Sequence, residues 1–333
     1  MGVLFPDNVN RANRVNQLAS DIAQLQSQIK EAVEDARTQD ERALEILDRL
    51  SKKLGFETLD EFLQGAQDML TPEDRAKYLE LKREFENQDL SVDISLKVGT
   101  GIAVIGFLSG RTATAISVLF SRSLIVVSFR AIGIGLVKIL SASVSEGVGL
   151  IRSGMNILRA TLKGKALAGK VARVARGLRV AGKVLLYLGF AFDLITIIYD
   201  AIGGDRQRDE FRAATKELCV RRFTVKEIQQ YSRIALSFES DAKAIIDLAD
   251  SLQELVDEGL IDQAAANKKV AEKMEDLEPK LSSAIDAVDD TTIWEMLAIQ
   301  DAESQIAWTD EDPNLSEILR IIDEEIDQDE KNL

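Results

Sequence analysis

Histidine is absent from this 333-residue chain, and cysteine occurs only once, at Cys219. Without histidine the chain cannot form Ser–His or Cys–His nucleophile pairs, an HExxH zinc site or any other histidine-containing metal centre. A single cysteine cannot form an intrachain disulfide, so cysteine usage leaves the redox compartment undecided. Arg221 and Arg222 follow closely and favour a lowered thiol pKa, although a lone buried thiol is the commoner case. We therefore expect no enzymatic activity, no catalytic residue, no metal and no cofactor.

Proline and aromatic residues are also scarce. The four prolines stand at positions 6, 72, 279 and 313, so the long stretch from 73 to 278 contains no helix breaker. Aromatic residues make up only 5% of the chain, while hydrophobic residues make up 46%. This composition suits helices packed through Leu, Ile, Val and Ala, so it predicts an all-α fold.

Two outer blocks, residues 1–92 and 206–333, carry apolar residues at alternating spacings of three and four, which is typical of long packed helices. In the first block, with Gln39 as the one miss, they are Val15, Leu18, Ile22, Leu25, Ile29, Ala32, Ala36, Ala43, Ile46 and Leu50. In the last block they are Ile228, Tyr231, Ala235, Phe238, Ala242, Ile245, Ala249, Leu252 and Val256. Gly55 and Gly259 follow these series as expected helix ends. We predict an elongated antiparallel helical bundle.

The middle block, residues 93–205, differs in composition. Between residues 94 and 192 there are 14 Lys or Arg and a single acid, Glu146, together with 14 of the 20 glycines. The charge of this stretch is +13, so the remainder of the chain carries −28 of a total of −15. An ordinary core rarely has such asymmetry, and we interpret this block as the functional part.

Glycine motifs in the middle block do not match a nucleotide site. Gly99, Gly101 and Gly106 have the spacing GxGxxxxG instead of GxGxxG. The segments 164–171 and 177–184 match GxxxxGK, but each has valine where Ser or Thr must contact magnesium. Small residues that allow close helix contacts are the better interpretation, so we expect no small-molecule substrate.

The apolar content of the middle block favours insertion into a lipid bilayer. A helix needs about 20 apolar residues to span the bilayer core. Residues 98–121 supply 24 positions with one charge, Arg111, and further uncharged runs follow. Gly106 and Gly110 form a GxxxG pair that suits close helix packing. The frequent Val, Ile and Thr of residues 112–129 leave a small β-tongue open for part of this hairpin. The predicted membrane-inserting residues are Val98, Ile102, Val104, Ile105, Phe107, Leu108, Ile116, Leu119, Phe120, Leu124, Ile125 and Phe129.

Basic residues are interspersed with these apolar runs. On a continuous helix Lys97, Arg111 and Arg122 would share one face, which after assembly would line a water-filled lumen. A second basic, amphipathic stretch spans residues 152–183 and suits anionic head groups, whereas its apolar face argues against nucleic acid. The predicted head-group or pore-lining residues are Lys97, Arg111, Arg122, Arg152, Arg159, Lys163, Lys170, Arg173, Arg176, Arg179 and Lys183. The alternative is a solvated basic face that docks on acidic helices.

Acidic residues gather at the other end of the chain. From Thr309 onward there are ten acids and two bases. We expect these acidic helices to cover the basic apolar block and to release it on membrane contact. Asp193 and Asp200, one heptad apart, are a weaker candidate for holding the same block through Lys or Arg partners.

Long heptad-patterned helices that flank a central apolar, glycine-rich block resemble the α-helical pore-forming toxins, a superfamily that includes cytolysin A, haemolysin BL and the non-haemolytic enterotoxin. In that family a helical tail carries a hydrophobic tongue that inserts into a bilayer, and protomers assemble into a ring. The resemblance implies a tongue within residues 96–203 and a tail formed by 10–54, 72–90 and 225–300. The middle block is also similar to channel-forming proteins of the apolipoprotein L type.

Together these features predict a soluble protein that binds an anionic lipid membrane, inserts its central apolar block and forms a homo-oligomeric pore, as a cytolysin or a cell-death effector. The start of the chain, MGVLFPDNVNR, has no long apolar run, so we expect a cytoplasmic location or export without a signal peptide before the target membrane is reached. The alternative is a non-enzymatic helical scaffold whose central block is its buried core.

Overall fold

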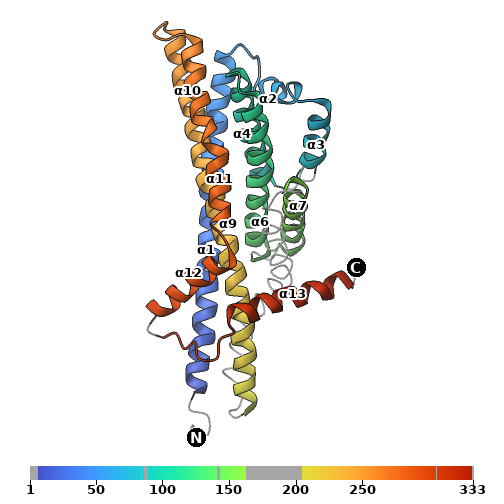
Figure 1. Cartoon of the computed structure of the whole chain (residues 1–333), viewed down its shortest axis with the longest axis vertical. Coiled ribbons are helices and arrows are strands. Elements are labelled where there is room, and N and C mark those ends of the chain that lie inside the picture. Colours follow the sequence, from blue (N-terminus) through green and yellow to red (C-terminus); the bar gives the residue numbers. More distant parts are fainter. Residues whose placement is uncertain are drawn as a thin grey trace.

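The computed structural model describes residues 7–83, 85, 89–140, 143–162, 205–304 and 306–331. Every regular element in these ranges is a helix (Figure 1), which confirms the predicted all-α class. Residues 112–129 are helical, so the β-tongue alternative is wrong for this segment. Burial against neighbouring helices has outweighed the strand preference of its Val, Ile and Thr residues.

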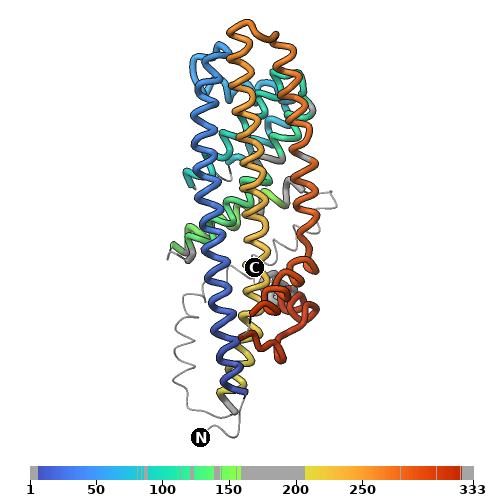
Figure 2. The backbone as a smooth tube through the Cα atoms, turned by 90° about the vertical axis from the view of Figure 1, so that its left-hand side faces the viewer, coloured from blue at the N-terminus to red at the C-terminus, as the bar shows by residue number. Residues whose placement is uncertain are grey.

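Two long helices form the axis of the molecule, and we call this pair the stalk. They are α1 (Asn8–Lys53) and α9 (Asp205–Asp257), 46 and 53 residues long, and they lie side by side in both views (Figures 1 and 2). At about 1.5 Å per residue they extend roughly 70–80 Å. Asn8 bonds Gln207 at one end and Lys53 bonds Asp250 near the other, so the two helices are parallel. The predicted antiparallel arrangement is therefore wrong for this pair, because the intervening chain returns to the end where α1 began.

The contact between the two stalk helices is the apolar seam expected from the sequence. Of the predicted positions of α1 all are buried except Ile46, which is partly buried, and those of α9 are buried up to Ala249. The seam also contains charged residues, since Asp40 and Glu239 are each only 1% exposed. Gly55 and Gly259 follow the two helices with φ of +90° and +71°, the left-handed conformation that glycine adopts without strain.

The antiparallel prediction holds for the first two helices that follow α9. α10 (Gln263–Glu275) and α11 (Leu277–Asp286) run back down the stalk, and the break between them falls at Asp276, just before Pro279 (Figure 1). α12 (Asp290–Glu303), which the sequence analysis did not identify as a separate helix, and α13 (Leu315–Lys331) lie across the lower half.

Two short helices follow α1, and both begin at a threonine cap. α2 (Leu59–Asp68) starts at Thr58, whose hydroxyl accepts from the Glu61 amide at 3.1 Å. The Glu61 carboxylate accepts from the amide of Glu57 at 2.9 Å instead of closing a full capping box on Thr58. α3 (Pro72–Arg83) starts at Thr71, as expected from Thr71-Pro72.

The described part of the middle, or central, block up to Leu162 packs along the upper half of the stalk as three successive passes. α4 (Leu90–Leu108) runs in the direction of α1; α5 (Thr112–Phe120), the π-helical segment η1 (Ser121–Val126) and α6 (Val127–Leu140) run back; α7 (Val144–Leu162) packs against α6 (Figure 1). The chain reverses at Gly110, where φ is +76°. There the Arg111 amide donates to the Gly106 carbonyl and the Gly110 amide to the Phe107 carbonyl, both at 3.0 Å, which is the Schellman pattern.

Two glycines of the apolar stretch 98–121, Gly101 and Gly106, allow close helix contacts, as expected for the small residues of this block. A methyl group on Gly106 would lie 2.9 Å from the β-carbon of Ala115, so α4 and α5 approach closely at this point. A methyl group on Gly101 would lie 2.5 Å from a methyl of Leu47 on α1. Gly110 bends the chain instead of taking part in a helix–helix GxxxG contact.

Replacing Gly110 with alanine tests the reversal. We expect Gly110→Ala to lower the free energy of unfolding by about 1–2 kcal/mol, because an L-residue is strained at this φ. Gly65→Ala is the matched control, since Gly65 lies inside α2 with open space around it, and it should raise the stability by about 0.5–1 kcal/mol. Urea denaturation measures both, and equal effects of the two substitutions would contradict the role of Gly110.

Candidate functional site

Two helical stretches of the central block have the length and composition needed to cross a membrane. They are α4, Leu90–Leu108, with 19 residues, and Thr114–Lys138, with 25. Most of each stretch is buried, 83% and 80% of its most apolar window, as in the core of a water-soluble protein. The composition of these two stretches thus suits a membrane-spanning helix, and the fold shields both of them from water.

The structure brings the predicted membrane-inserting residues together against the stalk and against one another. Three are partly exposed: Leu108, at 38%, and the half-buried Ile116 and Phe120. The buried ones are Val98, Ile102, Val104, Ile105, Phe107, Leu119, Leu124, Ile125 and Phe129. Insertion of these side chains into lipid therefore requires that they leave this core.

The basic residues predicted to share one helix face do not do so. The reversal at Gly110 separates Lys97, on α4, from Arg111, which lies in the turn, so the expectation of a continuous basic stripe is wrong. Lys97 pairs with Asp93 on its own helix, and Arg111 pairs with Glu275 of α10, each at 3.1 Å. Both pairs are exposed and contribute little to stability.

The remaining predicted basic residues are described only in part. Arg152 is exposed on α7. The side chains of Arg122 and Arg159 lie outside the described part of the chain, as do residues Lys163, Lys170, Arg173, Arg176, Arg179 and Lys183, the two GxxxxGK segments, Asp193 and Asp200.

A buried ionic group that the sequence analysis missed joins the central block to the stalk. Arg130 of α6 is 2% exposed, and its guanidinium pairs with Asp40 of α1 and, at 3.3 Å, with Glu239 of α9. It also donates to the Ser91 hydroxyl on α4 at 2.5 Å, and the Ser95 hydroxyl donates to Glu239 at 3.1 Å. We call these five residues the Arg130 cluster, and they bring α1, α4, α6 and α9 together at one level.

The chemistry of the Arg130 cluster is that of a positioning device. One guanidinium faces two carboxylates away from water, so its separation from them would leave uncompensated buried charge. A buried ionic group of this kind fixes the relative position of the helices that it joins, whereas apolar packing alone tolerates shifts between them. The sequence signal was available: Arg130 interrupts two uncharged runs, and Asp40 stands next to Gln39, the one miss in the α1 seam.

A second ionic group lies near the lower end of the stalk, and we call it the basal clasp. Glu311 accepts from Arg11 of α1 and Arg212 of α9, at 2.6 Å from each. Arg14 donates to Asp301 at 2.8 Å and also to Asp312. Arg222 bonds Asp301 and pairs with Asp21, each at 2.8 Å, and a cavity of about 570 Å³ lies beside these groups.

The basal clasp shows where the described C-terminal acids dock, whereas the basic residues 163–183 that they were expected to cover lie outside the described part of the chain. The described ion pairs that link the segment after Thr309 to the rest of the chain go to α1 and α9, including Lys216 with Glu317 at 2.6 Å. The acidic segment therefore docks on the base of the stalk, not on the described part of the basic block. The net charges of the segments favoured docking of the acidic segment on the basic block. Individual arginines on the two stalk helices instead supply close and well shielded partners.

Two acids of the basal clasp, Glu311 and Asp301, have lowered pKa values. Hydrogen bonds from Arg11 and then from Arg212 hold the pKa of Glu311 well below its usual range. Burial raises the pKa of Asp301, but bonds from Arg14 and Arg222 outweigh it, and the net pKa is lowered. Nearby, burial raises the pKa of the Cys219 thiol, so this residue is a lone buried thiol and not an activated nucleophile.

The described residues contain no group of three or more Cys, Asp or Glu side chains arranged to hold a metal ion. Comparison with models of known families, with curated proteins and with solved structures gave no match for this chain. The chemistry of the molecule must therefore be argued from its own residues, of which the Arg130 cluster and the apolar helices are the most distinctive.

Removing the guanidinium tests the Arg130 cluster. Arg130→Met should lower the free energy of unfolding by about 3–5 kcal/mol, because it leaves two carboxylates buried without their cation. Combining Arg130→Met with Asp40→Asn and Glu239→Gln should recover much of the lost free energy of unfolding. Lys138→Met is the matched control on α6, since its ion pairs to Asp89 and Glu146 are partly exposed and are worth about 1 kcal/mol or less. Equal losses for Arg130→Met and Lys138→Met in urea denaturation would refute this role.

Acid titration tests the basal clasp. The folded pKa of Glu311 lies below its unfolded value of about 4.3, so its contribution is complete above that pH and is lost as pH falls through the folded pKa. The stability difference between wild type and Glu311→Gln should be constant from pH 8 to about 5 and shrink below about 4. Trp308, which stacks on Arg11, reports docking by its fluorescence. The exposed Glu303, changed to Gln, is the control, and a difference that grows in acid would contradict the assignment.

Proposed function

We propose that this protein delivers its two apolar helical stretches into a lipid bilayer and that several copies then assemble into a pore. The observation that carries the proposal is the Arg130 cluster, which fixes two stretches of membrane-spanning length on a long stalk through one buried ionic contact. Breaking that contact would remove a buried ionic link that α4 and α6 share with α1 and α9, and leave only apolar packing to hold them there.

The dimensions of the two stretches support insertion as a hairpin. At about 1.5 Å per residue, α4 extends roughly 28 Å and Thr114–Lys138 roughly 38 Å, against a bilayer core of about 30 Å. The Gly110 reversal already joins them as neighbouring antiparallel segments. Transfer of their apolar side chains into lipid would supply about 25 cal/mol for each Å² removed from water.

The charges inside the second stretch favour assembly over insertion of a single copy. Arg130 lies well inside Thr114–Lys138, and a charge at that depth faces a partner or a water-filled cavity because hydrocarbon solvates it poorly. After leaving Asp40 and Glu239, the guanidinium would meet this requirement in a pore lined by several copies. Arg152 and the basic residues beyond it would contact anionic head groups.

A helical scaffold is the second candidate, and the burial of both apolar stretches favours it. In that case the central block is a permanent core that stiffens the stalk. The two functions differ in one physical requirement: insertion needs α6 to separate from α9, whereas a scaffold needs the contact to persist.

A reversible cross-link between α6 and α9 distinguishes the two functions. A β-carbon on Gly133 would lie 3.2 Å from the Ser232 hydroxyl oxygen, which suits a disulfide between Gly133→Cys and Ser232→Cys in a Cys219→Ala background. On dye-loaded vesicles that contain phosphatidylglycerol, the reduced protein should release dye and the oxidised protein should not. The two single-cysteine variants, treated with the same oxidant, control for oxidation itself.

Either of two results would overturn the membrane proposal. The first is equal dye release by the oxidised and reduced proteins, which would mean that the α6–α9 contact need not open. The second is no release by the wild type at any pH or lipid composition, which would favour the scaffold.

A further inference from the structure

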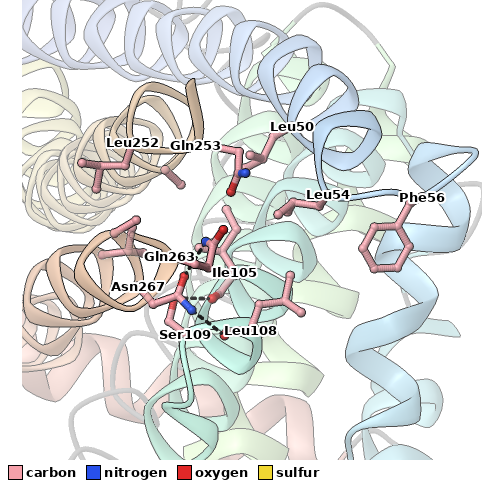
Figure 3. A pocket seen from close by; sticks show the side chains of 13 residues that line it. Leu50, Leu54, Phe56, Ile105, Leu108, Ser109, Leu252, Gln253, Gln263 and Asn267 are labelled. Atoms are coloured by element: carbon pink, nitrogen blue, oxygen red, sulfur yellow. Dashed lines mark hydrogen bonds between the residues drawn. The ribbon is translucent and has the colours of Figure 1, made fainter. Parts of the chain in front are cut away.

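A cavity of about 300 Å³ lies at the end of the stalk opposite the basal clasp, where the ends of α1 and α4 meet the start of α10 (Figure 3). Its wall is mostly apolar and comes from α1 and the turn after it, α4, α9 and α10. Its apolar lining includes Leu50, Leu54, Ile105, Leu108, Leu252 and Val270. A cavity of this size and lining is typical of small-molecule sites.

Polar groups gather on one side of the cavity. The Gln263 amide donates to Asn267 at 3.0 Å, and Asn267 donates to the Leu108 carbonyl at the end of α4 at 3.3 Å (Figure 3). Gln253 and Ser109 also line it. Among the described lining residues there is no ionisable side chain. Gln263 is exposed and Asn267 is half-buried, so these amides lie at the mouth of the cavity. They can exchange hydrogen bonds with an uncharged hydroxyl, whereas a charged head group would find no ionisable partner in the lining.

We propose that this cavity binds one molecule of a single-chain amphiphile with an uncharged hydroxyl head. The chain would contact the apolar wall, and the hydroxyl would face Gln263 and Asn267. The volume is about twice that of an engineered 150 Å³ cavity that binds benzene, so it accommodates an alkyl chain of medium length.

The position of the cavity means that a bound ligand stabilises the helix arrangement around it. A bound chain contacts α1, α4, α9 and α10 together, so it binds the folded arrangement and not the unfolded chain, and it stabilises that arrangement by mass action. This inference does not depend on membrane insertion, because the cavity exists in the form in which α4 is packed on the stalk.

Binding of 1-decanol to the full-length protein, below its solubility limit and without vesicles, tests the site. We expect saturable binding of one molecule per chain by calorimetry, and a melting temperature that rises with decanol concentration. Leu54→Trp, which adds volume at the cavity wall, should weaken the affinity about tenfold or more. Leu44→Trp is the matched control, a half-buried leucine of α1 that does not line the cavity.

Charged analogues test the head-group assignment. Decanoate and decyltrimethylammonium should bind at least about tenfold more weakly than decanol, since neither charge has an ionic partner in the lining. Equal affinity of all three would overturn the uncharged-head assignment. Absence of saturable decanol binding, or equal affinity of wild type and Leu54→Trp, would overturn the site itself, whatever the outcome of the dye-release experiment.

Discussion

The buried guanidinium of Arg130 sets the level at which four helices of this protein meet. Apolar side chains on α4 and α6 pack favourably against many positions of a long apolar seam, and contact area alone distinguishes these positions weakly. A cation that requires two carboxylates and a hydroxyl is far more selective, because only one arrangement brings Asp40, Glu239 and Ser91 to it. The α6–α9 contact and the level at which α4 lies on the stalk are consistent with this one register.

Much of the helical framework was predictable from the sequence, since it depends on local spacing. The seam of α1 and the glycines that follow both stalk helices lie where apolar periodicity and capping rules placed them. The mutual direction of the stalk helices was not predictable, because a seam with alternating spacing packs equally well in parallel and antiparallel pairs. That direction is decided by 150 residues of intervening chain, which periodicity does not describe.

The candidate site was predictable as a set of residues but not as an arrangement. The apolar residues from Val98 to Phe129 do gather, because their burial follows from composition. The bases of the same block separate, because one left-handed glycine ends the helix that would have aligned them. Asp40 was overlooked for a related reason: an acid on an acidic helix looks like a solvated residue until a partner from another helix, 90 positions away, is placed against it.

The parallel direction of α1 and α9 also has an electrostatic consequence. Peptide dipoles of antiparallel neighbours cancel, whereas those of parallel neighbours add, so each end of the stalk carries the partial charge of two helix termini, about half an elementary charge apiece. The positive end is the base, and Glu311 and Asp312 dock toward it, on Arg11 and Arg14 in the first two turns of α1 and on Arg212 further along α9. The stalk is therefore a polarised rod, and the acidic segment docks toward its positive end.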